Sequence, residues 1–125
     1  TQQIRTIDFM PTILDYLGIS LDPTKETLDG VSLLPLINNL EMDEEIAYSE
    51  TGNPLSEKQP PKAPNVMSVR NSNWKLIYNA HNDTKELYNL LDDPTESINL
   101  IGKNSDIESK LWNELLKIQQ SSSSI

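Results

Sequence analysis

The chain has 125 residues and a net charge of −9, with ten lysines and arginines against nineteen aspartates and glutamates. No basic face is clustered along it, which excludes nucleic-acid binding as its function. The absence of cysteine excludes a disulfide framework, a thiolate zinc site and a cysteine nucleophile within these residues, and no apolar run approaches the ~20 residues of a membrane span.

The N-terminal segment is strongly apolar from its start. It begins at Thr1 without a methionine or a targeting pattern, so we expect a piece of a larger protein. Residues 4–18 are predicted to form a helix, because their apolar side chains recur at helical spacing on one face. That face comprises Ile7, Met10, Ile13, Leu14 and Leu17, widened by Phe9 and Tyr16.

Pro11 restricts where this helix can begin, because proline lacks an N–H and fits only in the first turn. One alternative places Asp8 at the N-cap and Pro11 at the third helical position. The other begins the helix near Thr6 with a kink at Pro11. At the other end, Gly18 is expected to adopt a left-handed conformation, with Ile19 folding back onto the last turn.

A second short helix is predicted after the Asp29-Gly30 turn. Ser32 is a candidate cap, Pro35 follows three residues later, and Asn38-Asn39 ends the apolar run. Two helices with so little polar surface require a large apolar partner, and few candidates remain elsewhere in the chain.

The remainder predicts an antiparallel sheet. Residues 46–50 read as a short strand, and residues 51–64 as a long loop of the kind that is often functional or mobile. Hairpin signals then join strands at residues 66–70, 74–78 and 86–90. Trp74, Leu76 and Tyr78 share one face of the second of these strands.

A long amphipathic helix is predicted to cover the apolar face of that sheet. Ser105 and Glu108 form a capping-box pattern at its start, and Ile107, Leu111, Leu115 and Ile118 form its apolar stripe. We therefore predict an α+β fold with three to four antiparallel strands. Its parts are a helical segment (1–45), a sheet-plus-helix subdomain (46–120) and a disordered tail (121–125).

Four stretches resemble the C-terminal part of sulfatases, the sulfuric ester hydrolases of the alkaline phosphatase superfamily. The first is IDFMPTIL at residues 7–14 with Gly18-Ile19, and the second is DGVSL at residues 29–33 with Pro35-Leu36. Two more are SVR at residues 68–70 with WKLI at 74–77, and ELYNL at residues 86–90 with Asp93-Pro94-Thr95-Glu96 and Asn99-Leu100. Their order and spacing hold across nearly the whole chain.

The resemblance implies a larger enzyme, with a formylglycine nucleophile made from a C/S-x-P-x-R motif and a calcium ion that binds the sulfate. Both belong to the family's N-terminal catalytic domain, and no such motif occurs here. The resemblance therefore assigns no catalytic, cofactor-binding or metal residue to this chain. It implies that the first helix packs in the large domain, which would explain the unpartnered apolar segment (1–45).

Several polar residues have a structural and a functional interpretation. His81, the only histidine, is favoured as a solvated turn residue over a catalytic base. The acidic run Glu41, Asp43, Glu44 and Glu45 lacks the pattern of a calcium loop. Asp92, Asp93 and Glu96 are expected to bond nearby backbone N–H groups in a turn. Asn82-Asp83-Thr84 matches a glycosylation acceptor, a pattern frequent by chance.

Arg70 and Lys75 lie in the stretch nearest the sulfatase pattern. Structural or salt-bridging roles are favoured over substrate contact. The segment Glu50-Thr51-Gly52 leads into the long loop (51–64), which is hypothesised to border the substrate pocket.

The sequence supports three competing hypotheses of function. The first is the C-terminal part of a sulfatase, without catalysis of its own and partnered by the N-terminal catalytic domain. The second is the equivalent part of a related phosphodiesterase, phosphonate hydrolase or phosphoryl transferase. The third is a stand-alone interaction module. The isolated chain is expected to be inactive and to self-associate through residues 7–17 and 33–40.

Overall fold

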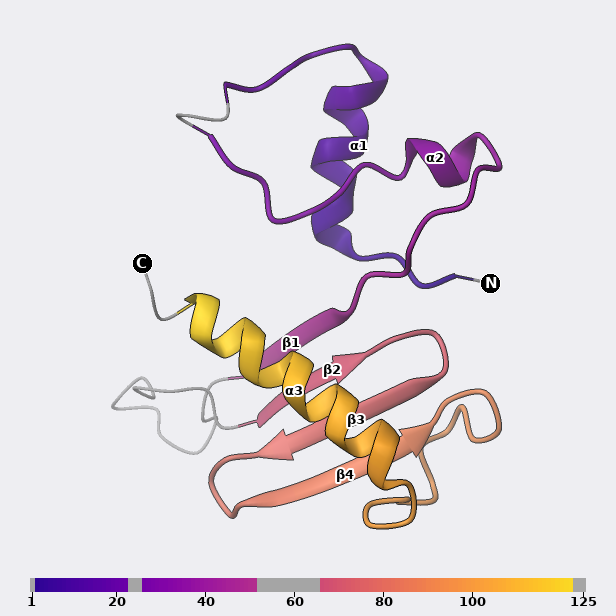
Figure 1. Ribbon diagram of the computed structural model, residues 1–125, viewed down its shortest axis with the longest axis vertical. Helices are drawn as coiled ribbons and strands as arrows, with labels where there is room; N and C mark the ends of the chain where they lie inside the picture. The colour runs from indigo at the N-terminus through magenta and orange to yellow at the C-terminus, as the bar shows by residue number, and fades with distance from the viewer. Residues whose placement is uncertain (1, 23–25, 52–65, 123–125) are drawn as a thin grey trace. The chain divides into compact units, whose positions relative to one another are not determined.

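The computed structural model describes residues 2–22, 26–51 and 66–122 (Figure 1). The chain divides into two units, Thr1–Glu45 and Ile46–Ile125, and each is described here by itself. Most of the predicted long loop (51–64) lies outside the described residues. Thr51 is described and ends a strand.

The second unit is built on a four-stranded antiparallel sheet in the order β1-β2-β3-β4. The strands are β1 (Ala47–Thr51), β2 (Val66–Arg70), β3 (Trp74–Asn79) and β4 (Thr84–Asn89). The predicted meander and its fourth strand are therefore confirmed. Asn71 fixes the tight β2–β3 turn, because its Oδ1 accepts the backbone N–H groups of Asn73 and Trp74 at 3.0 and 2.8 Å.

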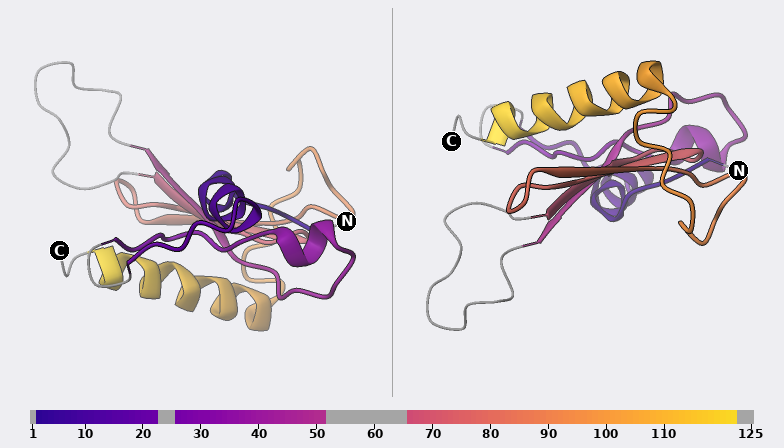
Figure 2. Two further views of the ribbon diagram at one scale, coloured as in Figure 1. Left: turned by 90° about the horizontal axis from the view of Figure 1, so that it is seen from above. Right: turned by 90° about the horizontal axis from the view of Figure 1, so that it is seen from below.

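Helix α3 (Ser105–Ser122) covers one face of this sheet (Figure 2). Side chains on a strand alternate between faces, and the fully buried ones all point toward α3. The core consists of Met67, Val69, Leu76 and Leu87 from the strands and Leu111 and Leu115 from the helix. The predicted covering helix and α+β fold are thus confirmed.

The opposite face of the sheet is called the open face below. Its side chains lie in register across the strands. One row is Ala47, Arg70, Lys75 and Tyr88, and the next is Ser49, Ser68, Ile77 and Glu86. This alternation of a buried apolar face and a polar face explains the period-two pattern of the strands.

The predicted capping box at the start of α3 is wrong. Ser105 is the first residue of the helix, and the Glu108 carboxylate accepts the backbone N–H of Gly102 at 3.1 Å. Gly102 has φ +74°, a conformation that turns the chain before the helix begins and that glycine adopts without steric cost. At its other end α3 continues to Ser122, two residues into the segment expected to be disordered.

The first unit contains a 3₁₀ turn η1 (Thr6–Asp8) that runs directly into helix α1 (Phe9–Tyr16). Pro11 is the third residue of α1, as the first alternative required. The predicted C-terminus is confirmed, because Gly18 has φ +66° and its N–H bonds to Asp15 O at 3.0 Å. The N–H of Ile19 reaches back to Leu14 O at 2.9 Å, completing a Schellman motif.

Helix α2 (Leu34–Ile37) is shorter than the sequence indicates. Ser32 was the expected cap, but Leu33 precedes the helix, and the Ser32 hydroxyl accepts the Leu34 N–H at 3.3 Å. The end of the helix is as predicted. Asn39 has φ +57°, and Leu40 N–H bonds to Pro35 O at 2.8 Å, which repeats the Schellman arrangement.

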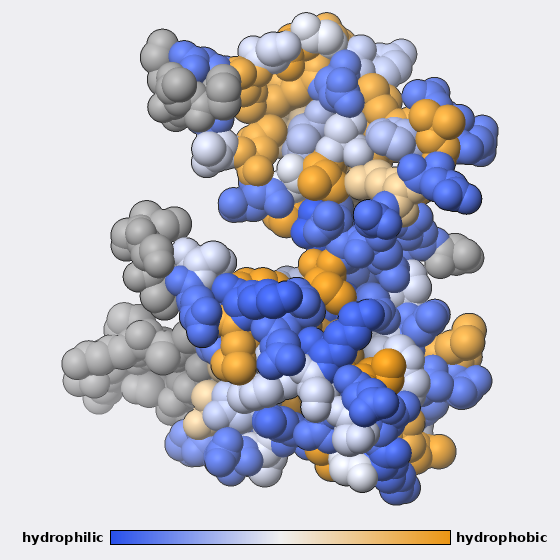
Figure 3. All heavy atoms as spheres, viewed as in Figure 1, coloured by the Kyte–Doolittle hydropathy of each residue, from blue (hydrophilic) through white to orange (hydrophobic). Residues whose placement is uncertain are grey.

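Apolar side chains remain exposed over the first unit, and Figure 3 shows them gathering on its surface. Phe9, Met10 and Ile13 are 52%, 57% and 54% exposed, and Tyr16 is 76% exposed. The predicted apolar face of α1 therefore lacks cover within the described residues. None of the helices among these residues has the length and hydropathy needed to cross a membrane.

Candidate functional site

The two N-terminal stretches singled out in the sequence meet at one buried carboxylate. Asp8 is 1% exposed. Its Oδ2 accepts the backbone N–H and Nε of Arg5 at 2.9 and 3.2 Å, and its Oδ1 accepts Nη2 of Arg5 at 2.7 Å. Oδ1 also accepts the backbone N–H of Val31 at 3.0 Å. We call this group of residues, with Thr12, Gly30 and Leu33, the clasp.

Electrostatics favour the charged form of Asp8. Burial alone would raise the pKa of this carboxyl, because desolvation disfavours charge. The bonds from Arg5 and from the Val31 N–H outweigh that effect and hold the pKa below its ordinary value. Arg5 also contacts Glu45 at 3.5 Å, so one guanidinium joins the 3₁₀ turn to the acidic run.

Thr12 adds two further hydrogen bonds to the clasp. Its hydroxyl donates to Asp8 O at 2.5 Å and accepts the backbone N–H of Leu33 at 2.9 Å. Asp8 and Thr12 are four residues apart and so lie on one side of α1. Between their two partners, Ser32 donates to Asp15 Oδ2 at 2.6 Å. The 3₁₀ turn η1 and helix α1 thereby bind three consecutive residues of the second stretch.

Gly30 allows this close approach. A Cβ added at this position would lie 2.1 Å from the carbonyl oxygen of Ile7 and 2.6 Å from its carbonyl carbon. Both atoms belong to the backbone, so no side-chain movement can relieve the overlap. Glycine is therefore required here by contact between two segments, whereas its φ is unremarkable.

The C-terminal stretch forms a second fixed element, loop 90–98, between β4 and α3. Asp93 organises it, because its Oδ2 accepts the N–H groups of Ser97 and Ile98 at 2.7 and 2.8 Å. The Ile98 bond is the largest influence on this carboxyl and lowers its pKa. The turn role predicted for Asp93 is thus confirmed.

Glu96 does not have the role expected for it. Its carboxylate binds Lys75 Nζ at 2.7 and 3.0 Å instead of a nearby backbone N–H. Both side chains are about three-quarters buried, with 23% and 30% of their area exposed. Asp92 likewise accepts a side-chain donor, Nδ2 of Asn89 at 2.7 Å. Lys75 therefore has the salt-bridging role, and its neighbour Arg70 lies exposed on the same face.

Asn99 closes the outer edge of β4. Its Oδ1 accepts the backbone N–H groups of Leu87 and Ile101 at 3.0 Å each, while Leu100 N–H bonds to Leu87 O at 2.8 Å. Edge strands otherwise present unpaired backbone groups. Asn99 and Leu100 of the sequence pattern thus pair the backbone N–H and C=O of Leu87 at the edge of β4, where the chain crosses from the sheet to the helix.

His81 and the acidic run, the remaining candidates, belong to different units. His81 is exposed in the β3–β4 turn, where its backbone N–H bonds to Asn79 Oδ1 at 3.0 Å. In the acidic run, Glu44 accepts Gln3 N–H at 3.1 Å and Glu45 contacts Arg5. Among the described residues, no three His, Cys, Asp or Glu side chains are placed to hold a metal ion.

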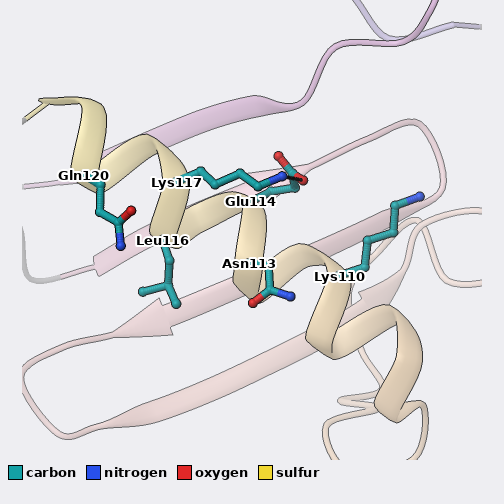
Figure 4. A pocket seen from close by; sticks show the side chains of 6 residues that line it. All are labelled: Lys110, Asn113, Glu114, Leu116, Lys117 and Gln120. Carbon is teal, nitrogen blue, oxygen red and sulfur yellow. Dashed lines mark hydrogen bonds and ion pairs between the residues drawn. The ribbon is translucent and has the colours of Figure 1, made fainter.

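A hollow on the outer side of α3 is lined by residues of that helix alone (Figure 4). Lys117 Nζ binds Glu114 Oε1 there at 2.7 Å. The lining comprises Lys110, Asn113, Glu114, Leu116, Lys117 and Gln120. It is an open helix surface formed mostly by polar residues and the stems of their side chains.

Sequence reasoning missed the clasp, although the motifs that it singled out contain every residue of the clasp except Arg5. Asp8 was considered only as a helix cap. A local sequence pattern does not reveal a hydrogen-bond donor 23 residues away, such as the backbone N–H of Val31. The signal that points to the clasp is an Asp and a Thr four residues apart in the first stretch, together with the Asp-Gly turn of the second stretch.

Comparisons with known proteins agree on one relationship. A family model described as N-sulphoglucosamine sulphohydrolase, C-terminal, matches residues 1–121. The chain is 34% identical over 94 residues to a choline-sulfatase of Rhizobium meliloti (strain 1021), covering 75% of this chain and 17% of that protein. It is 28% identical over 125 residues to a sulfatase of Formosa agariphila, covering 92% and 23%.

A solved structure shares the fold. It is that of BT4656 in complex with its substrate D-glucosamine-2-N,6-O-disulfate, which superposes with a TM-score of 0.71 at 26% identity. The match covers 90% of this chain and 23% of that chain. The chain thus spans 17% and 23% of the length of the two curated relatives.

Proposed function

The chain belongs to the N-sulphoglucosamine sulphohydrolase C-terminal family, and we propose that it is the C-terminal part of a larger enzyme that hydrolyses sulfate esters. In that enzyme its role is structural, with no catalytic residue of its own. The observation that carries this proposal is the family match over residues 1–121, which includes both stretches joined by the clasp.

The partner of this chain is then the N-terminal catalytic domain of the same polypeptide. The clasp fixes α1 to the second stretch through its polar side, while Phe9, Met10 and Ile13 stay about half exposed. Complete burial of an exposed side chain of this kind stabilises by roughly 1.5–3 kcal/mol, and the half that remains exposed here would contribute about half of that. The helical segment (1–45) therefore supplies apolar contact to that domain.

The chemistry is assigned to that domain as well. The described residues offer no ligand set for the calcium that the family implies, and the chain offers no precursor motif for the formylglycine. The chain has no cysteine and no C/S-x-P-x-R motif, and the described residues offer no three-ligand cluster. The calcium would bind the sulfate group and the formylglycine would act as nucleophile. We derive no step of the reaction from a residue of this chain.

Hydrolysis assays on the full-length protein test the proposal. We expect turnover of p-nitrophenyl sulfate, with slower turnover of p-nitrophenyl phenylphosphonate and bis-p-nitrophenyl phosphate. The 125-residue chain alone should turn over none of them. A full-length protein that prefers the phosphonate or the phosphodiester would identify the related hydrolase instead. Metal-dependent sulfate release by the chain alone would refute the structural role.

A matched pair of variants connects the chain to the activity. Asp8→Asn removes a buried carboxylate from the clasp, whereas Asp106→Asn removes an exposed one at the start of α3. In the full-length enzyme we expect Asp8→Asn to lower the fraction of active enzyme while leaving KM unchanged. Asp106→Asn should leave both unchanged. A selective rise in KM for Asp8→Asn would instead indicate substrate contact.

A further inference from the structure

We propose that the open face of the sheet, together with loop 90–98, is a second docking surface for the preceding catalytic domain, with Leu91 and Ile98 as its apolar anchors. This inference rests on the proposed function, because it takes that domain as the occupant. It concerns the second unit and is independent of the apolar face of α1.

Loop 90–98 folds onto the open-face side of the sheet. Lys75 belongs to the open face, since it lies in register with Arg70 and Tyr88, and Glu96 of the loop binds it at 2.7 Å. After Glu96 the chain passes the edge of β4 at Asn99 and reaches α3 on the opposite side. Figure 2 shows the loop and α3 on opposite sides of the sheet.

The loop is held in one conformation by its own side chains. Asp93 accepts two backbone N–H groups and the Thr95 hydroxyl. Asn89 Oδ1 accepts the Leu91 N–H at 3.1 Å, and the Lys75–Glu96 ion pair fixes the middle of the loop. Side chains carried by such a loop are ordered before a partner arrives, which lowers the entropy cost of binding.

That fixed loop presents two large apolar side chains outward. Leu91 is 73% exposed and Ile98 is 59% exposed. Among the described residues of the second unit they are the large apolar side chains with the greatest exposure. Leu91 precedes Asp92, and Ile98 lies between Ser97 and Asn99; each of these polar side chains makes a hydrogen bond. Binding residues are carried disproportionately by loops that a rigid scaffold holds in place.

The composition of the open face suits contact between domains. Its central side chains include Ile77, Tyr88, Lys75 and Glu86, and the Tyr88 hydroxyl donates to Glu86 Oε2 at 3.0 Å. Inter-domain interfaces within one chain are more polar than a core and bury roughly 600–1,500 Å². On the open face the polar side chains are already paired with one another, as Tyr88 is with Glu86, and the apolar anchors lie at one end.

The other side of this unit is a poor candidate for the same contact. The outer side of α3 presents Lys110, Glu114 and Lys117 around a shallow hollow (Figure 4). Lysine and glutamate are depleted at interfaces, and Lys117 is 69% exposed here, whereas Lys75 on the open face is 23% exposed and paired with Glu96. The relatives that match this chain are about four to six times its matched length, so a large preceding domain is available in them to occupy the open face.

Photo-crosslinking in the full-length protein tests the occupant. A benzophenone amino acid replaces Ile98, or Lys117 on the outer side of α3 as the control. We expect the Ile98 position to crosslink to peptides of the preceding domain and the Lys117 position to give no intramolecular product. Crosslinks from position 98 to residues 2–45, to a second copy, or to nothing would each overturn the proposal.

Charge substitutions supply a second test that does not require crosslinking. Leu91→Glu and Ile98→Glu replace exposed side chains, so the second unit should still fold, while Lys117→Glu is the control on α3. In the full-length protein we expect the two loop variants to separate one unfolding transition into two, and Lys117→Glu to leave it single. A single, unshifted transition for both loop variants would contradict the docking surface.

The outcomes also separate this inference from the proposed function. A full-length protein that hydrolyses sulfate esters but gives no crosslink from position 98 retains its function and lacks this surface. A protein that crosslinks as expected but hydrolyses another ester retains the surface and lacks the proposed activity.

Discussion

The carboxylate of Asp8 accepts the backbone N–H of Val31 at 3.0 Å, although the two residues are 23 positions apart. This bond joins the apolar helix to the Asp-Gly stretch, and Arg5 completes the charge balance. Each stretch alone has weak local preferences. Their stability therefore depends on a polar contact between them.

Replacement of Asp8 by asparagine should destabilise the first unit. An amide cannot accept from Arg5 and Val31 together with the same strength, and the largely buried guanidinium of Arg5 would lose its nearer counter-charge, keeping only Glu45 at 3.5 Å. Loss of charge-assisted bonds of this kind costs about 2–3 kcal/mol. Chemical unfolding of the full-length protein, with Asp106→Asn as the exposed control, measures the difference. Equal stability of the two variants would contradict the role of the clasp.

The contribution of Asp8 should depend on pH. Because the pKa of Asp8 is lowered in the folded state, its stabilisation is fully present above the unfolded value of ~3.9 and is lost as the pH falls through the lowered folded value. Subtracting the pH–stability curve of Asp8→Asn from that of the native protein isolates this group. The difference should be constant near neutrality and shrink in acid. A difference that grows in acid would show a raised pKa.

Gly30→Ala should be more harmful than Gly18→Ala. At Gly30 the added Cβ meets the Ile7 backbone at 2.1 Å, whereas at Gly18 nothing lies within 4 Å and only the positive φ resists alanine. The left-handed conformation alone costs about 1–2 kcal/mol. Thermal unfolding of both variants gives the comparison. A larger loss at Gly18 would mean that the two segments separate readily at Gly30.

Asn99→Ala should loosen the edge of β4, and Asn99→Asp should not. Alanine leaves the N–H groups of Leu87 and Ile101 without their acceptor, at about 1–3 kcal/mol for each group that becomes buried and unpaired. Aspartate keeps an oxygen in place. Hydrogen exchange at the Leu87 amide reports the change directly. Unchanged exchange in Asn99→Ala would assign the closure of the edge to the Leu100–Leu87 bond alone.

The Lys75–Glu96 pair should couple more strongly than Glu114–Lys117. Both have a contact of 2.7 Å, but the side chain of Lys117 is 69% exposed against 23% for Lys75. Double-mutant cycles on exposed pairs give about 0.2–1 kcal/mol, and added salt weakens the more exposed pair further. We expect the cycle at Lys75–Glu96 to lie at the upper end of that range. Equal coupling would remove the anchoring role of Glu96.

The isolated 125-residue chain should self-associate through the uncovered apolar face of the first unit. Phe9, Met10 and Ile13 are about half exposed, and contiguous exposure of this kind favours association. Sedimentation velocity over a concentration series measures it, and Ile13→Ser should shift the distribution toward monomer. Lys117→Ser on α3 is the control. A strictly monomeric chain at high concentration would contradict the expectation.

Sequence reasoning predicted the elements whose causes are local. The β2–β3 hairpin follows from alternation and from Asn71, and the end of α1 follows from Gly18, since each depends on residues within a few positions. The clasp and the Lys75–Glu96 pair could not be predicted in this way. Their partners are 21 and 23 positions apart, and several other residues offered the same chemistry. Glu108 illustrates the point. Its spacing from Ser105 predicted a capping box, but its carboxylate accepts the backbone N–H of Gly102 instead.

The order of strands has a consequence for how quickly the second unit folds. From β2 to β4 each strand pairs with its neighbour in sequence across a turn of three or four residues, and contacts of such short separation form fast. Strands β2 to β4 can therefore pair as soon as they leave the ribosome, before α3 has been synthesised. Until α3 arrives, the apolar face that carries Leu76 and Leu87 is exposed to chaperones and to aggregation.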